Sequence, residues 1–549
     1  MHFLQAVCLL VCALVANAKT VSYEFNVGYV TAAPDGFSKQ VIGINGKWPI
    51  PTIECDVGDT LSITVHNKLP DQTTSLHFHG IWQAGTQLSD GPSGITQCPI
   101  QPGQSYTYTF VANPAGTHWY HAHEKGQYPD GLRGKMIVHD KAWEKTLKVD
   151  KQIHLSMSDW FHRTMPQMID DYMSPDNTQA VFDTPNSFLF NDAKKPFDIK
   201  LMKGKKYLLR IVNVGAVACG RFRIDNYTLS VVEIDGVQVV PHEADAIVLC
   251  AGQSYAVVVK GQEEPKGASH WYAQMDTDML TGDVPIKDEF AVIGKIIYDM
   301  IEEVERELPQ KQKRAEVRVL EDFVVKPLDG QKLLSPVDNR IDFTTNQTYF
   351  PGIGTRTPLN SDPWVPPKVP TLYTALTTGS MDPATYGPGV NPWIVKSGEV
   401  VQIHMHNPHN RPHPMHLHGH VFQIVAKGSG TWNRQESGFP EVPSKRDGLV
   451  VPAHGYAIIR FKADNPGVWF FHCHVDFHLV GGMAATIIEA PNLLKGSVPE
   501  AGKHLCDAGG FRSSGNCAGE PFKITASEAR TKCNTVYNTK VRGAKIQKS

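Results

Sequence analysis

The sequence lacks a charge excess of either sign, and beyond its first residues it lacks any long apolar run. Lys and Arg number 53 against 55 Asp and Glu, for a formal net charge of -2. So weak a field does not indicate nucleic acid or an anionic membrane as a partner. No stretch after Val15 resembles a membrane-spanning helix, which needs about 20 predominantly apolar residues. We therefore expect no nucleic-acid partner and no membrane span.

Basic residues are also missing ahead of the one apolar run, Phe3 to Val15. Ala16-Asn17-Ala18 follows with the small residues of a signal-peptide cleavage site. A membrane anchor is the alternative interpretation, but the run is short for one. We expect residues 1–18 to be a signal peptide and the mature protein to be secreted, either extracellular or in the cell wall.

Cysteine is scarce, with 10 among 549 residues, and two of these lie in the signal peptide. An oxidising compartment favours disulfides, yet the number left after setting aside Cys473 is odd, so at least one is unpaired. Their pairing cannot be read from spacing. The sequons at Asn226 and Asn346 predict glycosylation on surface loops. The cysteines available for disulfides are Cys55, Cys98, Cys219, Cys250, Cys506, Cys517 and Cys533.

The chain is too long for one hydrophobic core and reads as several β domains. Short alternating runs such as Val57–Val65 and Ser105–Val111 recur between turn residues, as do 206–212 and 229–234. This pattern favours β-sandwiches or barrels over βαβ units. The expected boundaries are 1–18 for the signal peptide, 19–143, 144–300 and 326–491 for three domains, 301–325 for a charged linker, and 492–549 for a cysteine-containing tail.

The first and third domains read as copies of one unit. Gly58–Asn67 resembles Gly398–Asn407, and Gly116–His123 resembles Gly467–His474. The second domain lacks the corresponding histidine-bearing strands.

Histidine is the residue type present in excess, at 24, and four His-x-His pairs stand out. Alternation along a strand places both imidazoles of a pair on one face. Eight imidazoles are too many for one zinc ion, which takes three or four ligands. They suit several metal ions at the interface between the first and third domains, and we call them the histidine cluster. Its pairs are His77/His79, His121/His123, His416/His418 and His472/His474.

Cys473 lies between the two histidines of the last pair and points to the opposite face of that strand. Thiolate, imidazole and thioether ligands form the ligand set of a blue-copper electron-transfer site. His413, His478 and Met483 supply the remaining ligands. Histidines that are incidental to a strand are the alternative, which the number of pairs disfavours. Electrons could pass from Cys473 to the cluster through its flanking histidines.

Four segments resemble the signature loops of the multicopper oxidases: His77–Gly80, His118–His123, His413–His420 and His472–His478. Thr96–Ile100, Arg210–Gly215 and Phe461–His474 resemble the fungal branch that contains ferroxidases and laccase-like pigment oxidases. The resemblance covers the mature chain and implies an all-β fold of three cupredoxin-like domains. It also implies an enzyme that takes single electrons from a reducing substrate and reduces dioxygen to water.

The resemblance further implies four copper ions, each with its own ligands. The type 1 copper would take His413, Cys473, His478 and axial Met483; the type 2 copper would take His77 and His416; the type 3 pair would take His79, His121, His123, His418, His472 and His474.

Two acids are candidates for catalysis, because reduction of dioxygen to water consumes protons. Asp90 matches the family's aspartate next to the cluster, and Asp476 stands where many relatives carry glutamate. Either could instead only orient a ligand histidine. We favour proton delivery for Asp90 and leave both roles open for Asp476.

Residues near the type 1 site indicate which class of reducing substrate the enzyme uses. An axial Met483 implies a modest potential, suited to phenols, enediols or ferrous iron. Ferroxidases of the branch carry acids here, whereas this chain places Phe182 at one position with Asp183 beside it, and Ser380 or Asp382 at the other. Relatives that work with iron permeases also carry a C-terminal membrane span, which is missing from this sequence.

We therefore expect a secreted, monomeric, laccase-like oxidase of phenolic substrates, acting in pigment or secondary-metabolite formation. Asp183 and His478 would contact the substrate. The alternatives are a ferroxidase and, in a different class, a copper carrier without turnover. A type 1 site linked to a complete cluster disfavours the carrier.

Overall fold

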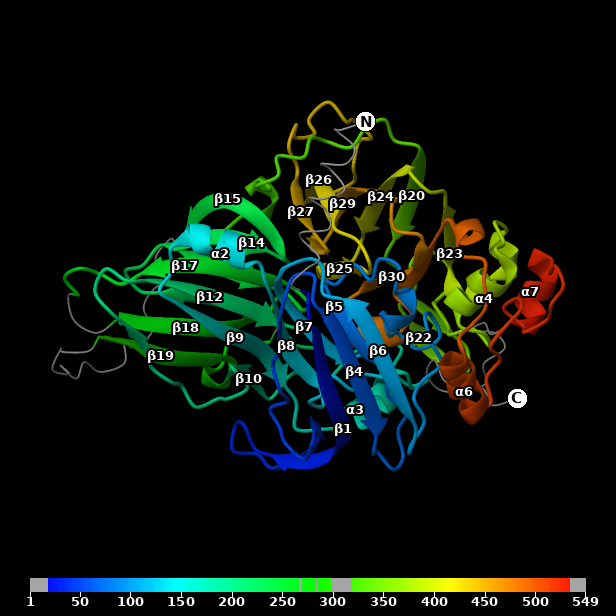
Figure 1. Ribbon diagram of the computed structural model, residues 1–549, viewed down its shortest axis with the longest axis horizontal. Coiled ribbons are helices and arrows are strands. Elements are labelled where there is room, and N and C mark those ends of the chain that lie inside the picture. Colours follow the sequence, from blue (N-terminus) through cyan, green and yellow to red (C-terminus); the bar gives the residue numbers. More distant parts are fainter. Residues whose placement is uncertain (1–17, 266–268, 283, 299–317, 534–549) are drawn as a thin grey trace.

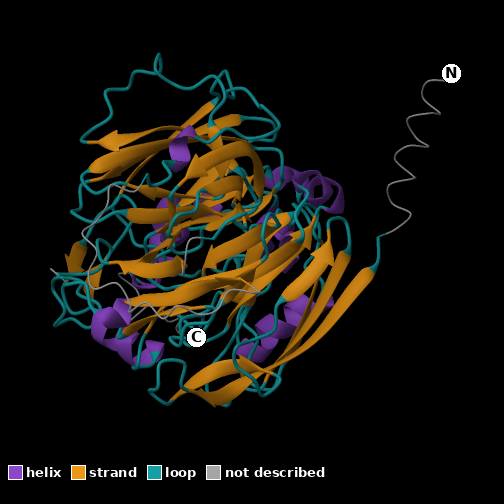
Figure 2. Ribbon diagram, turned by 90° about the vertical axis from the view of Figure 1, so that its left-hand side faces the viewer, coloured by secondary structure: helices purple, strands orange, loops and turns teal. Residues whose placement is uncertain are grey.

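The computed structural model describes residues 18–265, 269–282, 284–298 and 318–533, and strands dominate it (Figures 1 and 2). Residues 1–17 of the expected signal peptide and most of the expected linker at 301–325 lie outside the described residues. Among those described, no helix has the length and apolar character to cross a membrane. The α-helices are α2 (Lys141–Leu147), α3 (Met165–Tyr172), α4 (Thr371–Thr378), α5 (Asp476–Val480), α6 (Glu500–Gly509) and α7 (Ala526–Lys532).

Short 3-10 helices occur in the connections between these elements. They are η1 (Gln87–Ser89), η2 (Asp288–Phe290), η3 (Asp322–Val324), η4 (Pro383–Thr385), η5 (Pro388–Val390) and η6 (Pro491–Leu493).

The first β domain packs the sheet β2-β1-β4-β6 on the sheet β3-β8-β7-β5. The order mixes parallel pairing of β1 with β4 and antiparallel pairing of β4 with β6, as in a Greek-key sandwich. Its strands are β1 (Thr20–Ala32), β2 (Lys39–Ile44), β3 (Ile53–Asp56), β4 (Thr60–Asn67), β5 (Leu76–His79), β6 (Ser105–Val111), β7 (Gly116–Ala122) and β8 (Arg133–His139).

The second β domain pairs the sheet β10-β9-β12-β17-β14-β15 with the sheet β11-β19-β18-β13-β16. Its strands are β9 (Lys151–Trp160), β10 (Ser187–Phe190), β11 (Ile199–Leu201), β12 (Lys206–Asn213), β13 (Cys219–Ile224), β14 (Leu229–Ile234), β15 (Val237–Ala244), β16 (Ala246–Leu249), β17 (Ser254–Lys260), β18 (Ser269–Asp276) and β19 (Ala291–Tyr298).

The third β domain repeats the architecture with β20-β24-β29-β26-β27 against β23-β31-β30-β25-β28, plus the hairpin β21-β22. Its strands are β20 (Asn339–Thr344), β21 (Thr348–Phe350), β22 (Gly354–Arg356), β23 (Pro392–Val395), β24 (Val400–Asn407), β25 (His413–Leu417), β26 (Phe422–Ser429), β27 (Ser444–Arg446), β28 (Gly448–Val451), β29 (Gly455–Lys462), β30 (Gly467–Cys473) and β31 (Ala484–Glu489). The expected all-β fold of three cupredoxin-like domains is confirmed, and the structural neighbours of the chain share it.

The strands expected from alternation occur, and the one expected at Val57–Val65 is shifted to Thr60–Asn67. β6 and β14 have the expected bounds, and β12 extends one residue further. β4 begins at Thr60 instead of Val57, because Gly58 adopts a φ of +90° and Asp59 accepts a hydrogen bond from the Asp56 amide. That tight turn cannot continue a strand, so the chain enters the sheet only after it.

Apolar packing joins the three domains around one centre. One core cluster runs through the second and third domains, where Phe182 stacks on Phe477 with ring centroids 5.0 Å apart. A second cluster runs from the first domain into the third, where it includes Phe470. β5, β25 and β30 therefore meet near the middle of the molecule (Figure 1).

Three disulfides account for most of the cysteines. Cys98–Cys506 ties α6 of the tail to the first domain, Cys219–Cys250 lies in the second domain, and Cys517–Cys533 closes a loop within the tail. Cys55 and Cys473 are free and buried. The expectation of disulfides with an unpaired cysteine is confirmed, and only the structure supplies their pairing.

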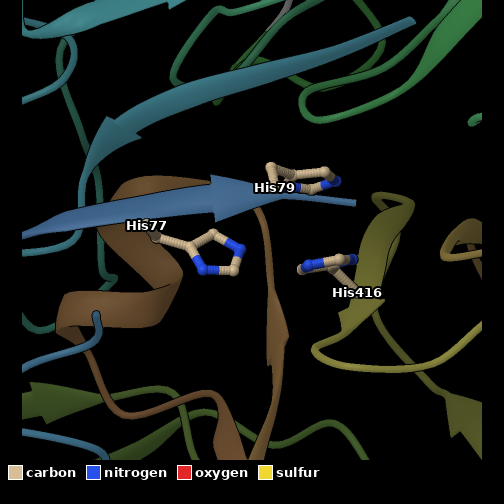
Figure 3. Close-up of side chains that lie close together, drawn as sticks. All are labelled: His77, His79 and His416. Carbon is tan, nitrogen blue, oxygen red and sulfur yellow. The ribbon is translucent and has the colours of Figure 1, made fainter. Parts of the chain in front are cut away.

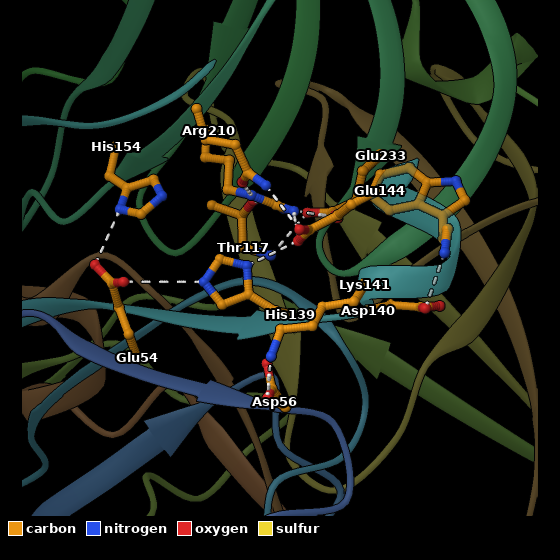
Figure 4. Close-up of polar contacts among 12 residues, drawn as sticks. Glu54, Asp56, Thr117, His139, Asp140, Lys141, Glu144, His154, Arg210 and Glu233 are labelled. Atoms are coloured by element: carbon orange, nitrogen blue, oxygen red, sulfur yellow. Dashed lines mark hydrogen bonds and ion pairs between the residues drawn. The ribbon is translucent and has the colours of Figure 1, made fainter. Parts of the chain in front are cut away.

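A buried ion-pair network joins the second domain to the first (Figure 4). Arg210 on β12 donates to the Thr117 hydroxyl of β7 at 3.0 Å, to Glu233 at 3.0 Å and to Glu144 at 2.8 Å. Glu233 in turn accepts the Thr117 amide at 2.7 Å. Since β7 also carries His121, the network holds a histidine-bearing strand of the first domain against the second.

Replacing Arg210 by alanine should destabilise the protein. Glu233 has only 1% of its surface exposed, and removing one partner of a buried pair costs about 3–5 kcal/mol because the other charge is left unpaired. We expect a clear fall in the calorimetric unfolding temperature. Arg163→Ala is the matched control: its pairs with Asp171 and Asp183 lie at the surface and are worth about 0–1 kcal/mol. Equal shifts for both variants would contradict the prediction.

Candidate metal centres

The His-x-His strands lie next to each other within each domain, in matching register. In the first domain β5 pairs antiparallel with β7, and His77 lies opposite His121. In the third domain β25 pairs antiparallel with β30, and His416 lies opposite His472. Opposite residues of such strands share a face, so each sheet presents its two histidine pairs together.

The two sheets face each other and bring the eight histidines into one cluster. Figure 3 shows His77 and His79 extending from β5 toward His416 of β25. Within each of three groups, one possible ligand atom per residue lies within 4.8 Å of the others. The groups are His77/His79/His416, His79/His121/His474 and His123/His418/His472.

Two of these groups match the six histidines expected for the type 3 pair, three to each ion. The first group contains His77 and His416, expected for the type 2 ion. Each group draws on both the first and the third domains, so neither domain could form these sites alone.

The donor set fits metal ions because its ring nitrogens are buried without a hydrogen-bond partner. A buried polar atom without a partner is costly, and a metal ion would satisfy all of these atoms at once. Burial among other histidines also holds the pKa of His121 and of His418 well below the usual range, so both are neutral and able to coordinate. The unpaired nitrogens are Nε2 of His77, His121, His123, His416 and His474, and both ring nitrogens of His79.

On the opposite face of β30, three of the residues expected to hold the type 1 copper lie together. Cys473 Sγ lies 3.7 Å from His413 Nδ1 and 3.5 Å from His478 Nδ1, and these two nitrogens are 3.2 Å apart. Burial raises the pKa of the Cys473 thiol to about 12, so binding of a metal would release its proton. Met483 is fully buried, and its carbonyl accepts the Cys473 amide at 3.0 Å.

A covalent and hydrogen-bonded path connects this site to the cluster. His472 and His474 flank Cys473 in the chain, and His472 Nδ1 donates to the Cys473 carbonyl at 2.9 Å. The strand therefore joins a thiolate site on one face to cluster histidines on the other.

Asp90 lies inside the cluster with no exposed surface. Its carboxylate accepts from His418 Nδ1 at 2.9 Å and lies 3.2 Å from His77 Nδ1. Burial raises the pKa of Asp90, with His77 acting in the opposite direction. The position suits either of the expected roles, proton donor or orienting group.

Asp476 begins α5 and lines a cavity of about 510 Å³ that also reaches His121, His123 and His472. Burial raises the pKa of Asp476 to about 7, and its Oδ2 is buried without a partner. A carboxyl that binds and releases a proton near neutral pH, in a cavity beside the cluster, suits proton delivery.

The side chains expected near the outer edge of the type 1 site have partners within the protein. His478 keeps 8% of its surface exposed and packs against Phe182. Asp183, expected at the substrate, accepts hydrogen bonds from Arg163. Of the other two candidates, Ser380 Oγ lies 2.7 Å from the Thr385 hydroxyl, and Asp382 accepts the Ala384 amide.

Sequence reasoning gave no role at these sites to two residues. His409 matches no ligand position and is expected to be an ordinary surface or core histidine, yet its Nδ1 lies 3.1 Å from His413 Nε2. Asp447 touches the cluster from the third domain, and its carbonyl accepts from His416 Nδ1 at 2.8 Å. The signal available for Asp447 was the dipeptide Asp447-Gly448, which matches Asp90-Gly91 in the copied unit.

The two sequons differ in environment. Asn226 is exposed in the turn between β13 and β14. Asn346 is half-buried, and its amide nitrogen donates to the Asn360 carbonyl at 2.5 Å. Glycosylation remains a prediction at both, and Asn226 is the more accessible site.

Family models described as multicopper oxidase match residues 26–143, 151–286 and 364–493. The iron transport multicopper oxidase fetC of Epichloe festucae is 38% identical over 92% of this chain and 82% of that protein. The iron transport multicopper oxidase FET5 of Saccharomyces cerevisiae is 36% identical over 94% of this chain and 88% of that protein.

Solved structures agree in fold. The crystal structure of Fet3p, a multicopper oxidase that functions in iron import, is similar with a TM-score of 0.86 and 29% identity, covering 94% of this chain and 99% of that one. The laccase from Botrytis aclada is similar with a TM-score of 0.76 and 27% identity, covering 93% and 95%.

Proposed function

The chain belongs to the multicopper oxidase family, and on that premise we propose that it oxidises Fe(II) to Fe(III) with dioxygen as electron acceptor. Its general chemistry is that of a copper-dependent oxidoreductase. One observation carries the choice of donor: relatives aligned over more than nine-tenths of this chain are named iron transport multicopper oxidases.

The expectation of a phenolic donor, with a role in pigment or secondary-metabolite formation, is wrong. The iron-transport relatives and the similarity to Fet3p overturn it. The physical reason is that a methionine ligand at position 483 would give the type 1 copper a modest potential, which suits ferrous iron as well as phenols. The expectation also rested on the displaced acids around Phe182 and on the missing C-terminal span. Neither feature identifies the electron donor.

The outer edge of the type 1 site supports a small donor. His478 exposes only a small fraction of its surface beside Phe182, and His409 lies over the outer nitrogen of His413. A hydrated ion needs little contact area for outer-sphere electron transfer, whereas an aromatic ring gains affinity from a wider apolar cleft.

The reaction balances as four Fe(II), one dioxygen and four protons giving four Fe(III) and two waters. Bound copper supplies the one-electron redox chemistry. His413, Cys473 and His478 would hold the ion that receives electrons, and the eight cluster histidines would hold the other three. Asp476 would deliver protons from the cavity, and Asp90 would donate or hold them beside His418.

We also propose that the protein acts outside the cell. The support is the signal-like segment at residues 1–18 and a set of disulfides, which persist in oxidising compartments.

Oxygen uptake by the purified, copper-loaded protein tests the donor. We expect kcat/KM for Fe(II) to exceed that for hydroquinone by roughly tenfold or more, a difference of about 1.4 kcal/mol in transition-state stabilisation. Both donors are compared in one buffer, with electrode traces of dioxygen and optical detection of Fe(III).

Spontaneous oxidation of Fe(II) is subtracted with the Cys473→Ser protein under the same conditions. Equal or faster turnover of hydroquinone would contradict the proposal.

A further inference from the structure

His79 differs from the other cluster histidines in how its ring is held. For His77, His121, His416 and His472 the Nδ1 atom donates to a backbone carbonyl at 2.8–3.0 Å, which leaves Nε2 free for a metal. His79 alone among the eight, all of which lie in the described part of the chain, has both ring nitrogens buried without a partner. Nothing on its own strand fixes its orientation.

Asp447 is the polar group that faces this ring. Its Oδ1 is buried, lacks a hydrogen-bond partner and lies 3.6 Å from His79 Nε2. This distance is slightly beyond a hydrogen bond, and forming one would require the two side chains to move closer. With Nε2 donating to Asp447, only Nδ1 of His79 is left to join His121 and His474 around an ion. His79 would then present Nδ1 to the metal, whereas the neighbouring histidines present Nε2.

Asp447 occupies the position in the third domain that Asp90 occupies in the first. Both precede a glycine, Gly91 and Gly448 respectively. The Asp90 carbonyl accepts from His77 Nδ1 at 2.8 Å, and the Asp447 carbonyl accepts from His416 Nδ1 at 2.8 Å. Each backbone oxygen therefore orients the first histidine of a pair in its own domain.

The two carboxylates are placed reciprocally across the domain interface. Asp90 accepts from His418, the second histidine of a pair in the third domain. Asp447 faces His79, the second histidine of a pair in the first domain. Each of the two related domains thus places an aspartate beside a histidine of the other domain.

The second domain holds Asp447 in place although it carries none of the expected ligands. Arg446, fully buried, donates through Nε and Nη2 to both carboxylate oxygens of Asp235 at 2.7 and 3.0 Å. It also donates to Asp322 at 2.6 Å and to the Tyr255 hydroxyl at 3.0 Å. A bidentate pair of this kind fixes orientation as well as distance, and Asp447 is the next residue along the chain.

We propose that Asp447 is a positioning residue that accepts a hydrogen bond from His79 Nε2 and thereby directs His79 Nδ1 to one of the paired type 3 sites. Arg446 and Asp235 set the position of Asp447, so the second domain contributes to the assembly of a cluster that it does not ligate. The role requires an acceptor oxygen at Asp447 and does not require a change in its protonation.

The test uses the full-length, copper-loaded protein with Asp447→Ala and Asp447→Asn. In the alanine variant His79 loses its orienting acceptor and one triad is reduced to two fixed ligands. We expect copper content to fall from four ions to about three per chain, or the coupled pair to yield a new EPR-visible copper. The blue absorption of the type 1 site should stay unchanged. The asparagine variant keeps an acceptor oxygen and should match the unsubstituted protein.

Asp59→Ala is the matched control, since Asp59 is an equally buried aspartate that accepts hydrogen bonds from the backbone nitrogens of Lys19 and Asp56. It should leave copper content and the EPR spectrum unchanged. If Asp447→Ala fails to fold, Asp447→Ser, whose side chain is too short to reach His79, replaces it with the same expected spectrum.

Three results would overturn the proposal. One is full copper content with an unchanged EPR spectrum in the alanine or serine variant. Another is equal damage from asparagine and alanine. The third is copper loss in the Asp59 control, which would make the effect one of removing any buried aspartate.

Discussion

Cys473→Ser is expected to abolish the blue colour and steady-state turnover while leaving the copper of the histidine cluster bound. A serine hydroxyl is a hard, weakly acidic ligand that cannot replace a thiolate in a blue-copper site. Cys473 also links the type 1 site to His472 and His474 on one strand, so electrons lose both their entry point and their path. Visible absorption, copper content and oxygen uptake with Fe(II) measure the three effects.

Cys55→Ser is the matched control for this substitution. Cys55 is the other free cysteine among the described residues, and burial raises the pKa of its thiol to about 12, as it does for Cys473. It lies on β3, in a different strand from any of the cluster histidines. Its replacement should leave colour and turnover intact. Retained blue absorption in Cys473→Ser would refute the assignment of the type 1 site.

Asp90→Asn should slow the reduction of dioxygen by about 100-fold, the lower end of what a positioned proton donor contributes. The amide cannot release a proton as the buried carboxyl can, while the Asp90 carbonyl still accepts from His77. Reduction of the type 1 site by Fe(II) should keep its rate, because His413, Cys473 and His478 are unchanged. Stopped-flow measurements of blue bleaching without oxygen, and of recovery with oxygen, separate the two steps.

Copper content must be measured alongside, because Asp90 also contacts His418. If recovery of the blue colour keeps its rate in a fully loaded variant, Asp90 only orients its histidine. Loss of copper would likewise assign it an orienting role.

The misassigned donor shows where local sequence carries little information. Phe182 and Asp183 are neighbours in the chain, yet one packs against His478 and the other pairs with Arg163. Strand and loop geometry decides which of two adjacent side chains faces a site. Position in an alignment therefore could not show which acids reach the type 1 edge, nor that His409 lies on His413.

The sequence by itself determined the period-two strands, the four His-x-His pairs and the thiolate between the last two histidines. Those features depend on local alternation, which places residues i and i+2 on one face of a strand wherever the strand lies. Only the tertiary structure decided which histidines form each triad, which cysteines pair, and that Arg446 and Asp447 connect the second domain to His79. Most of these contacts, such as His79 with Asp447 and Cys98 with Cys506, join residues hundreds of positions apart, and the packing of the three domains brings them together.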